Sequence, residues 1–346
     1  MTSQRIAIAG AGVAGLCLAL TLLRRGQRVT LYDPVSAEET ASWAAAGMLA
    51  PTYEAATDSP GHPEIFALLE AARDFWDDGP ESFGIERQQI GLMLSSSVAL
   101  AVSAGQASMF RRLAKHGRAR ALDVRDRGSL GDLNPDGFVA AFWLPRDGQV
   151  DNRAFVKCLT QEVLSLGGER KSLAVDPAKV APGDLSADCI VDARGWRSPG
   201  MTPVKGTAMA LAPHPGLPGH VVRWGRNYLV PKADRVVLGA HAMPGLTDTS
   251  VDPAVIDELR AEAALVFPAV NDADVLETWS GVRPRSADGA PVLGWTGPGH
   301  YQLGGLYRDG FLLAPRLADW AASDILGDGL PDLARRFSPD RFKVRA

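Results

Sequence analysis

The chain is poor in the residues on which disulfide frameworks and metal sites depend. It has three cysteines in 346 residues, Cys17, Cys158 and Cys189, and their odd number and wide spacing exclude a disulfide framework and a zinc motif. Its six histidines are scattered without paired spacing, so we predict no metal site. This cysteine usage is typical of a reducing compartment, and we expect a cytoplasmic protein.

The chain also lacks an excess of positive charge. Lys and Arg total 36 against 40 Asp and Glu, a formal net charge of −4. The longest basic cluster, residues 111–120, is interrupted by apolar residues and is typical of a solvated helix face. A nucleic-acid-binding protein normally carries a basic stripe, so we predict no nucleic-acid partner. With 46% hydrophobic residues the chain can bury a sizeable core, and its length favours two domains.

One uncharged run of 18 residues, Ile6–Leu23, has the length of a signal peptide or a short membrane span. Gly10, Gly12 and Gly15 interrupt it and divide it into a strand, a turn and a helix. Gly26 follows at the position of a left-handed helix cap. We therefore expect a soluble protein with no membrane partner.

The three glycines form the pattern G-x-G-x-x-G between a predicted strand over 5–9 and a predicted helix over 13–25. Gly10 permits a tight turn, Gly12 lets the backbone approach a pyrophosphate, and Gly15 lets the helix pack closely on the sheet. A predicted strand over 27–33 ends at Asp33, whose carboxylate can accept hydrogen bonds from ribose hydroxyls. This context predicts a dinucleotide-binding βαβ unit whose helix N-terminus faces the pyrophosphate.

The remaining pattern indicates a chain that leaves this first unit and returns to it. It predicts helices over 64–77, 98–116, 155–166 (with Asn152 as N-cap), 253–267 and 311–326, strands over 188–193 and 301–303, a hairpin of 228–231 and 235–240, and a domain crossing over 196–220. The strand that runs into Gly195 and the glycine-rich turns near the C-terminus favour FAD over NAD, because a simple NAD dehydrogenase does not need this return.

Three segments carry a family resemblance: Ala41–Pro51 (ASWAAAGMLAP), Trp279–Gly294 (WSGVRPRSADGAPVLG) and Gly304–Pro315 (GGLYRDGFLLAP). Together they resemble the D-amino-acid oxidase superfamily and, within it, the glycine oxidase branch of thiamine biosynthesis. The resemblance implies an α/β fold with a Rossmann-like FAD-binding domain of the glutathione-reductase type and a discontinuous, mixed-sheet α+β substrate domain. It assigns residues 1–60, 146–202 and 272–346 to the FAD-binding domain, and residues 61–145 and 203–271 to the substrate-binding domain.

The resemblance also implies roles for particular residues. Arg283, in the segment read as an R-P turn, and the hydroxyl of Tyr228 would bind a substrate carboxylate, and Arg308 would lie near the substrate or the flavin. A planar guanidinium matches a carboxylate with two hydrogen bonds. The implied contacts to non-covalent FAD are Gly10, Gly12, Val13, Ala14, Gly15, Asp33, Ser42, Ala46, Gly47, Met48, Gly195, Arg283, Gly305, Tyr307, Arg308, Asp309, Gly310 and Phe311.

The implied activity is oxidative deamination of a small amino acid or amine, such as glycine, sarcosine or a D-amino acid. Hydride transfer to flavin N5 would give an oxo acid, ammonia and, with O₂ as acceptor, H₂O₂. The chain has no G-x-S-x-G nucleophile motif, which agrees with chemistry done by the cofactor. Three alternatives stay open: a dehydrogenase that passes electrons to another acceptor, a secondary-amine oxidase, and a non-catalytic FAD- or NAD-binding scaffold that serves as a subunit. The protein could also form a homo-oligomer.

Several positions leave alternatives open or depart from the family pattern. Arg283 could pair with Asp288, Tyr228 could be an ordinary strand aromatic, and Arg308 could pair with Asp309 or a surface acid. Met48 and Trp43 could serve the core alone. The departures from the family are Asp309 in place of Asn, the bulky Arg285, residues 241–243 (HAM), and a turn enlarged by Arg194 and Trp196. We hypothesise that Arg285 favours a substrate with a second negative group.

Overall fold

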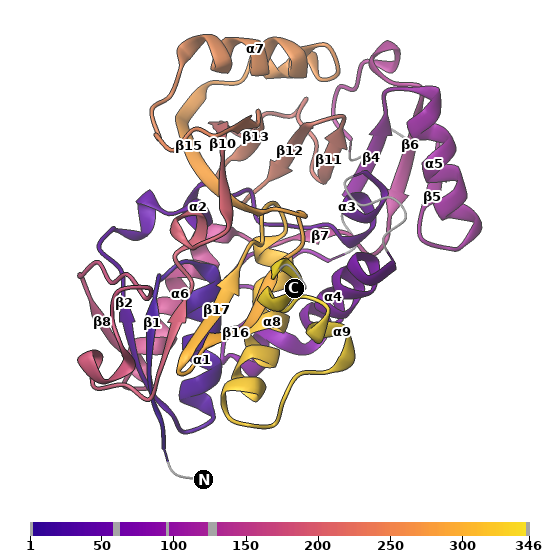
Figure 1. The fold of residues 1–346 in the computed structure, drawn as a ribbon. Coiled ribbons are helices and arrows are strands. Elements are labelled where there is room, and N and C mark those ends of the chain that lie inside the picture. The colour runs from indigo at the N-terminus through magenta and orange to yellow at the C-terminus, as the bar shows by residue number, and fades with distance from the viewer. Residues whose placement is uncertain (1–2, 58–62, 95–96, 124–129, 344–346) are drawn as a thin grey trace.

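A computed structural model of the chain describes residues 3–57, 63–94, 97–123 and 130–343. Two large sheets dominate it, one below the other in Figure 1. A short antiparallel pair, β3 (Met48–Leu49) with β7 (Gly148–Gln149), joins segments that lie between them. The boundary that the sequence suggested at residues 60 and 61 lies outside the described residues.

The lower sheet has six strands, five of them parallel. In spatial order they are β16 (Val292–Gly297), β17 (His300–Gly304), β9 (Cys189–Asp192), β1 (Arg5–Ala9), β2 (Arg28–Tyr32) and β8 (Glu169–Lys171). Only the edge strand β16 runs antiparallel to its neighbour. Because the parallel strands end at the same edge, the turns that follow β1, β9 and β17 meet there.

The uncharged run at residues 6–23 forms β1 and α1 (Val13–Arg24), which confirms the strand–turn–helix reading. Gly26 ends this helix with a φ of 78°. Helices α1, α4 (Pro63–Ser82), α6 (Asn152–Ser165) and α8 (Gly310–Ile325) share one apolar core with the sheet, and the short α9 (Asp332–Arg335) joins them. Figure 1 shows α1, α6 and α8 beside the lower sheet.

The upper sheet has nine strands. They are β14 (Met243–Pro244), β10 (Met201–Leu211), β13 (Val236–Gly239), β12 (Asn227–Pro231), β11 (Val221–Trp224), β4 (Ser97–Ala101), β6 (Ala140–Leu144) and β5 (Arg120–Leu122) in order, with β15 (Val275–Ser286) paired to β10. Helix α7 (Pro253–Ala264) covers it at the top of Figure 1, and α5 (Ala104–Lys115) flanks β4 and β6.

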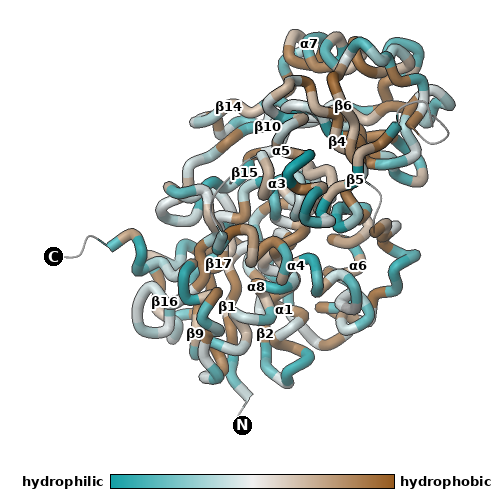
Figure 2. The backbone as a smooth tube through the Cα atoms, turned by 90° about the vertical axis from the view of Figure 1, so that its right-hand side faces the viewer, coloured by the Kyte–Doolittle hydropathy of each residue, from teal (hydrophilic) through white to brown (hydrophobic). Residues whose placement is uncertain are grey.

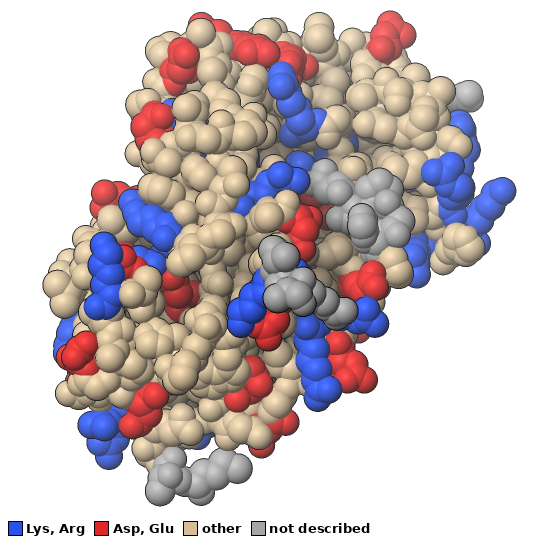
Figure 3. All heavy atoms as spheres, in the orientation of Figure 1, with Lys and Arg blue, Asp and Glu red and all other residues tan. Residues whose placement is uncertain are grey.

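Short helices complete the structure: α2 (Ala41–Ala44), α3 (Pro51–Thr57) and 3-10 turns at Ala37–Glu39, Pro135–Gly137, Pro182–Leu185, Gly195–Arg197, Pro268–Val270 and Pro339–Phe342. Figure 2 shows hydrophobic segments gathered in each sheet region. Figure 3 shows acidic and basic side chains interspersed on the face in view.

Three sequence predictions of local structure are wrong. The helix over 98–116 divides into β4 and α5, with Ser103 as N-cap, because the apolar run Val98–Ala101 pairs with strands on both sides. The predicted domain crossing over 196–220 contains the 11-residue strand β10. This strand pairs with β15 along its whole length in spite of its Gly and Pro residues. The R-P turn is part of β15, in which Pro284 faces Pro203.

Two further details differ from the sequence reading. Asp151, and not Asn152, caps α6, because its carboxylate accepts hydrogen bonds from Arg153 N and Ala154 N. Strand β15 lies in the range assigned to the FAD-binding domain although it pairs along β10 in the upper sheet. Conversely, α4 lies in the substrate range although its buried face packs in the core of the lower sheet.

Candidate active site

A cavity of about 480 Å³ lies between the strand ends of the lower sheet and one face of the upper sheet. The glycine turn after β1, the loop 40–48, and residues from β12, β15 and the N-terminus of α8 line it. The structure thus brings together sixteen of the residues singled out from the sequence. They are Gly10, Gly12, Val13, Ala14, Asp33, Ser42, Ala46, Gly47, Met48, Gly195, Tyr228, Arg283, Tyr307, Arg308, Gly310 and Phe311.

The glycine turn has the backbone that the motif requires. Gly10 has a φ of 107°, and a Cβ there would lie 2.3 Å from Ala193 O at the end of β9. A Cβ on Gly15 would lie 2.0 Å from Gly10 O, so Gly15 permits close contact between helix and turn without lining the cavity. Gly12, Val13 and Ala14 line the cavity, so the N-terminus of α1 faces it.

Asp33 stabilises the glycine turn. Its carboxylate accepts hydrogen bonds from Ala11 N at 2.6 Å and Val35 N at 3.1 Å. A carboxylate has about four lone-pair positions, so these bonds leave acceptor capacity for a ribose. Ser42 Oγ accepts from Val13 N at 2.9 Å and joins the loop 40–48 to the start of α1.

The loop 40–48, which we name the cavity loop, is held by its neighbours. Thr40 caps α2, and Asn152 donates to the carbonyls of Ser42 and Trp43. Gly47 has a φ of 71°, and a Cβ there would lie 2.1 Å from Val150 O. The sequence reading missed this use of Asn152 because its partners lie more than one hundred residues away.

Arg283 and Tyr228 meet on the upper-sheet side of the cavity. The guanidinium of Arg283 lies on the backbone of Gly206, and its Nη1 donates to His241 O at 3.4 Å. Burial raises the pKa of Tyr228 in spite of the nearby Arg283, so its phenol stays protonated as a donor. Burial lowers the pKa of Arg283 from its ordinary value.

The sequence left open that Arg283 pairs with Asp288. The structure instead pairs Asp288 with Arg341 at 2.8 Å, and its hydrogen bonds hold the turn after β15. Arg285 is exposed, lies 5.8 Å from the centre of the Tyr307 ring, and is absent from the described cavity lining. The hypothesis of a second anion at Arg285 therefore finds no support in its position.

Arg308 is half-buried, lines the cavity and lies beside a pair of buried charges. Its Nε lies 4.0 Å from Glu54 Oε2, and Glu54 forms a 2.6 Å ion pair with Arg223. Both partners of that pair are buried, and Arg223 stacks on the Tyr53 ring at 3.7 Å. The acid beside Arg308 is thus an interior residue and not one on the surface.

The last turn connects the cofactor side to the substrate side. Tyr307 N donates to Pro284 O at 3.0 Å, directly beside Arg283, and Tyr307 has a φ of 46°. Asp309 occupies the N-cap position of α8 without a side-chain cap hydrogen bond, Gly305 has a φ of 69°, and neither residue lines the cavity. The N-terminus of α8 at Gly310 and Phe311 faces the cavity, where its dipole favours negative charge.

Sequence reasoning missed several lining residues. They are Arg226, Ala240, Thr247, Thr249, the close-contact glycine Gly206, Val175 and Arg197. Gly206 was missed because the sequence predicts a domain crossing where β10 forms. The others lie outside the segments that carry the family resemblance.

The residues present fit a bound dinucleotide with a redox ring. The cavity is lined by the glycine turn after β1 and by the N-termini of α1 and α8, and close backbone contacts at Gly10, Gly15 and Gly47 leave no room for a side chain at those positions. In the described part of the chain, no group of three or more His, Cys, Asp or Glu could hold a metal ion.

A family model described as FAD dependent oxidoreductase matches residues 5–323. The chain belongs to this family. It is 29% identical to glycine oxidase of Geobacillus kaustophilus over 340 residues, which cover 90% of this chain and 89% of that protein. It is 31% identical to the bifunctional protein ThiO/ThiG of Synechocystis sp. over 99% of this chain and 54% of that protein, so it spans about half of that relative.

The solved structures agree. A crystal structure of glycine oxidase from Geobacillus kaustophilus matches with a TM-score of 0.83 at 25% identity, covering 99% of this chain and 100% of that one. The family match confirms the predicted superfamily, fold class, FAD dependence and oxidoreductase class. No helix in the described residues has the length and apolar character needed to cross a membrane.

Proposed function

We propose that this protein oxidises the carbon–nitrogen bond of a small amino acid or amine carboxylate, of the glycine, sarcosine or D-amino-acid type. The balanced reaction for a primary amine takes the amino acid, O₂ and water to an oxo acid, ammonia and H₂O₂. The observation that carries this proposal is the pairing of Arg283 with Tyr228 at the cavity, beside the loop that a flavin would face. The names of the glycine oxidase relatives give further support.

The residues divide the work of binding and orientation. Arg283 binds the substrate carboxylate through its planar guanidinium, and Tyr228 adds a hydroxyl donor because its raised pKa keeps it protonated. Arg308 adds positive charge on the same side, with the buried Glu54 holding it in place. These three residues orient the substrate so that its α-carbon faces the cofactor side.

The cofactor contacts follow the same cradle. The backbone around Gly10, Gly12 and Gly15, with the N-terminus of α1, receives the pyrophosphate, and Asp33 accepts from the ribose. FAD, when bound, accepts the two electrons and the hydrogen of the substrate and passes the electrons to O₂. The N-terminus of α8 at Gly310 lines the cavity and would favour negative charge on a group bound there. None of the three cysteines lines the described cavity, which supports non-covalent binding.

Oxygen uptake by the purified protein tests this function directly. Glycine, sarcosine and D-amino acids are supplied in turn, and H₂O₂ and ammonia are measured with the oxygen consumed. We expect at least one of these substrates to be consumed with equal amounts of O₂ and H₂O₂. Substrate oxidation that needs an added electron acceptor, with no oxygen uptake, would instead establish a dehydrogenase.

A further inference from the structure

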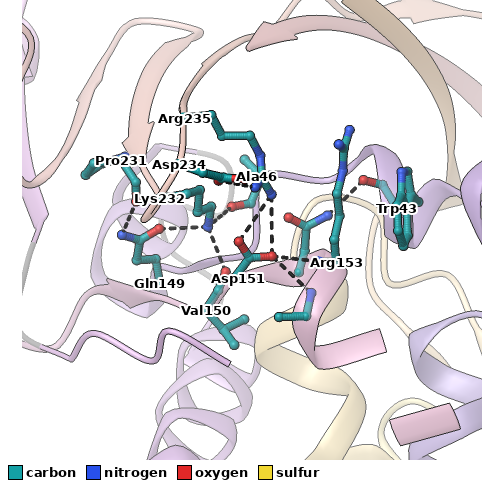
Figure 4. Close-up of polar contacts among 12 residues, drawn as sticks. Trp43, Ala46, Gln149, Val150, Asp151, Arg153, Pro231, Lys232, Asp234 and Arg235 are labelled. Atoms are coloured by element: carbon teal, nitrogen blue, oxygen red, sulfur yellow. Dashed lines mark hydrogen bonds and ion pairs between the residues drawn. The ribbon is translucent and has the colours of Figure 1, made fainter. Parts of the chain in front are cut away.

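The turn of the β12–β13 hairpin, which carries Tyr228 in its first strand, contains a lysine bonded to three carbonyl oxygens (Figure 4). Lys232 follows β12 in the turn before β13, and its Nζ donates to Ala46 O at 2.8 Å, Val150 O at 2.7 Å and Gln149 Oε1 at 2.7 Å. An ammonium has three donors, so all three are used. Burial lowers the pKa of Lys232 to about 7, the mark of a cation largely removed from water.

One of these acceptors, Ala46, lines the cavity, and the other two lie in a segment bonded to the cavity loop. Ala46 lies in the cavity loop, and Val150 N donates to Gly47 O at 2.8 Å, which joins residues 46–47 and 149–151 into one unit. Residues 149–151 also contact the β12–β13 hairpin through two further interactions. Gln149 Nε2 donates to Pro231 O, and Asp151 pairs with Arg235 at 3.2 Å.

A second contact from the upper sheet to the cavity loop comes from β15, the strand that carries Arg283. Trp279 Nε1, in β15, donates to Ala44 O at 2.8 Å. Tyr228 and Arg283 each stand four residues along the chain from a side chain that bonds the cavity loop, Lys232 in one case and Trp279 in the other. Ala44 and Ala46 both line the cavity. The two strands that present the substrate residues are therefore bonded to the same loop.

We propose that Lys232 is a positioning residue that sets the cavity loop, and the flavin against it, at a fixed distance from Tyr228 and Arg283. The expected effect of Lys232 on catalysis rests on the proposed function. Its physical basis is that two backbone carbonyls and one amide oxygen lose their donor together when the ammonium is removed. The cavity loop then keeps its covalent path and its bond to Trp279 but loses its bond to the turn between β12 and β13.

The kinetic test compares Lys232→Met with wild-type holoprotein in anaerobic stopped-flow reduction by the substrate identified above. Small misplacements of reacting atoms cost up to roughly 100-fold in rate, so we expect the limiting reduction rate to fall about 10-fold or more. Substrate affinity should change little, because Arg283 and Tyr228 remain. The matched control is Arg73→Met, which removes a buried cation bonded to Arg146 O and Asp77, none of them in the cavity lining.

Trp279→Phe provides the second variant, because it deletes the indole N–H bonded to Ala44 O while keeping a six-membered aromatic ring at the position. It should slow reduction in the same way as Lys232→Met. An unchanged limiting rate in both variants, or an equal fall in Arg73→Met, would overturn the proposal.

Hydrogen–deuterium exchange of the holoproteins separates this proposal from the proposed function. We expect faster amide exchange across residues 41–50 in Lys232→Met and wild-type exchange there in Arg73→Met. If no amine reduces the wild-type flavin, the proposed function fails while the exchange result still decides the role of Lys232. Unchanged exchange in Lys232→Met would show that the lysine does not hold the cavity loop, whatever the substrate.

Discussion

The guanidinium of Arg283 lies directly on the backbone of Gly206, where an added Cβ would come within 2.3 Å of Nη2. Gly206 has no backbone strain to relieve, so its missing side chain matters only for this contact. The position of the proposed carboxylate ligand therefore depends on a glycine in the neighbouring strand β10.

Gly206→Ala should displace Arg283 and weaken carboxylate binding by roughly 10–100-fold while FAD stays bound. Titration of the holoprotein with acetate, followed by the flavin difference spectrum, gives the dissociation constant. Gly183→Ala is the control, because a Cβ there meets nothing within 4 Å. Equal acetate affinity in Gly206→Ala and wild type would show that the guanidinium tolerates displacement.

Replacement of Arg283 itself should have a larger effect. Losing one partner of a buried charged hydrogen bond costs about 2–5 kcal/mol, so Arg283→Met should lower kcat/KM by roughly 30-fold or more. Arg285→Met, two residues along the same strand, should leave kcat/KM unchanged for mono- and dicarboxylic substrates because Arg285 is exposed and absent from the described lining. A dicarboxylate-specific loss in Arg285→Met would restore the hypothesis of a second anion at that side chain.

Gly10→Ala should impair FAD binding without removing any polar contact. Gly10 has a φ of 107°, and the new Cβ would collide with Ala193 O at 2.3 Å, so the turn must open. We expect purified Gly10→Ala to contain little FAD and to bind added FAD at least about 10-fold more weakly than wild type. Gly297→Ala, where a Cβ meets nothing within 4 Å, should bind FAD normally. Full FAD occupancy in Gly10→Ala would contradict the assigned turn.

Asp147 should make stability depend on pH. Burial raises the pKa of this carboxyl to about 6, although it accepts from Thr52 N and Tyr53 N at the start of α3. A carboxyl whose folded pKa is raised contributes most stability below its unfolded pKa and loses that contribution as pH rises through the folded pKa. Between about pH 4 and pH 7, the Tm of Asp147→Asn should therefore rise relative to wild type.

The control for this pH dependence is Asp332→Asn, because Asp332 is 98% exposed and its Tm difference from wild type should stay constant over the same range. A constant difference for Asp147→Asn as well would mean that burial does not shift the titration of Asp147.

Much of the fold could be predicted where local sequence and tertiary structure demand the same thing. The glycine turn at residues 10–15 needs positive φ and close contact, and only glycine supplies both. The β12–β13 hairpin and α8 likewise carry turn residues and apolar spacing that agree with their final positions. Strands β4, β10 and β15 escaped prediction because pairing with strands from distant parts of the chain outweighs their weak local preference.

The candidate site divides in the same way. Arg283 and Tyr228 could be named because they stand in motifs that resemble a family, and the structure places both at one cavity. Gly206, Asn152 and Lys232 could not be named, since each acts on a residue more than seventy positions away. Each of them matters because of a contact with a distant part of the chain, and the spacing of residues in the sequence does not predict such contacts.

The most direct test of the central claim is the absorbance spectrum of the purified protein under anaerobic conditions. The spectrum is recorded before and after addition of glycine, sarcosine and a panel of D-amino acids. We expect oxidised flavin bands in the resting protein that bleach with at least one of these substrates, and no bleaching by the same substrate in Arg283→Met. Flavin bands that none of them bleaches would contradict the proposed amine oxidation, and a protein that shows no flavin bands even with added FAD would contradict the cofactor site itself.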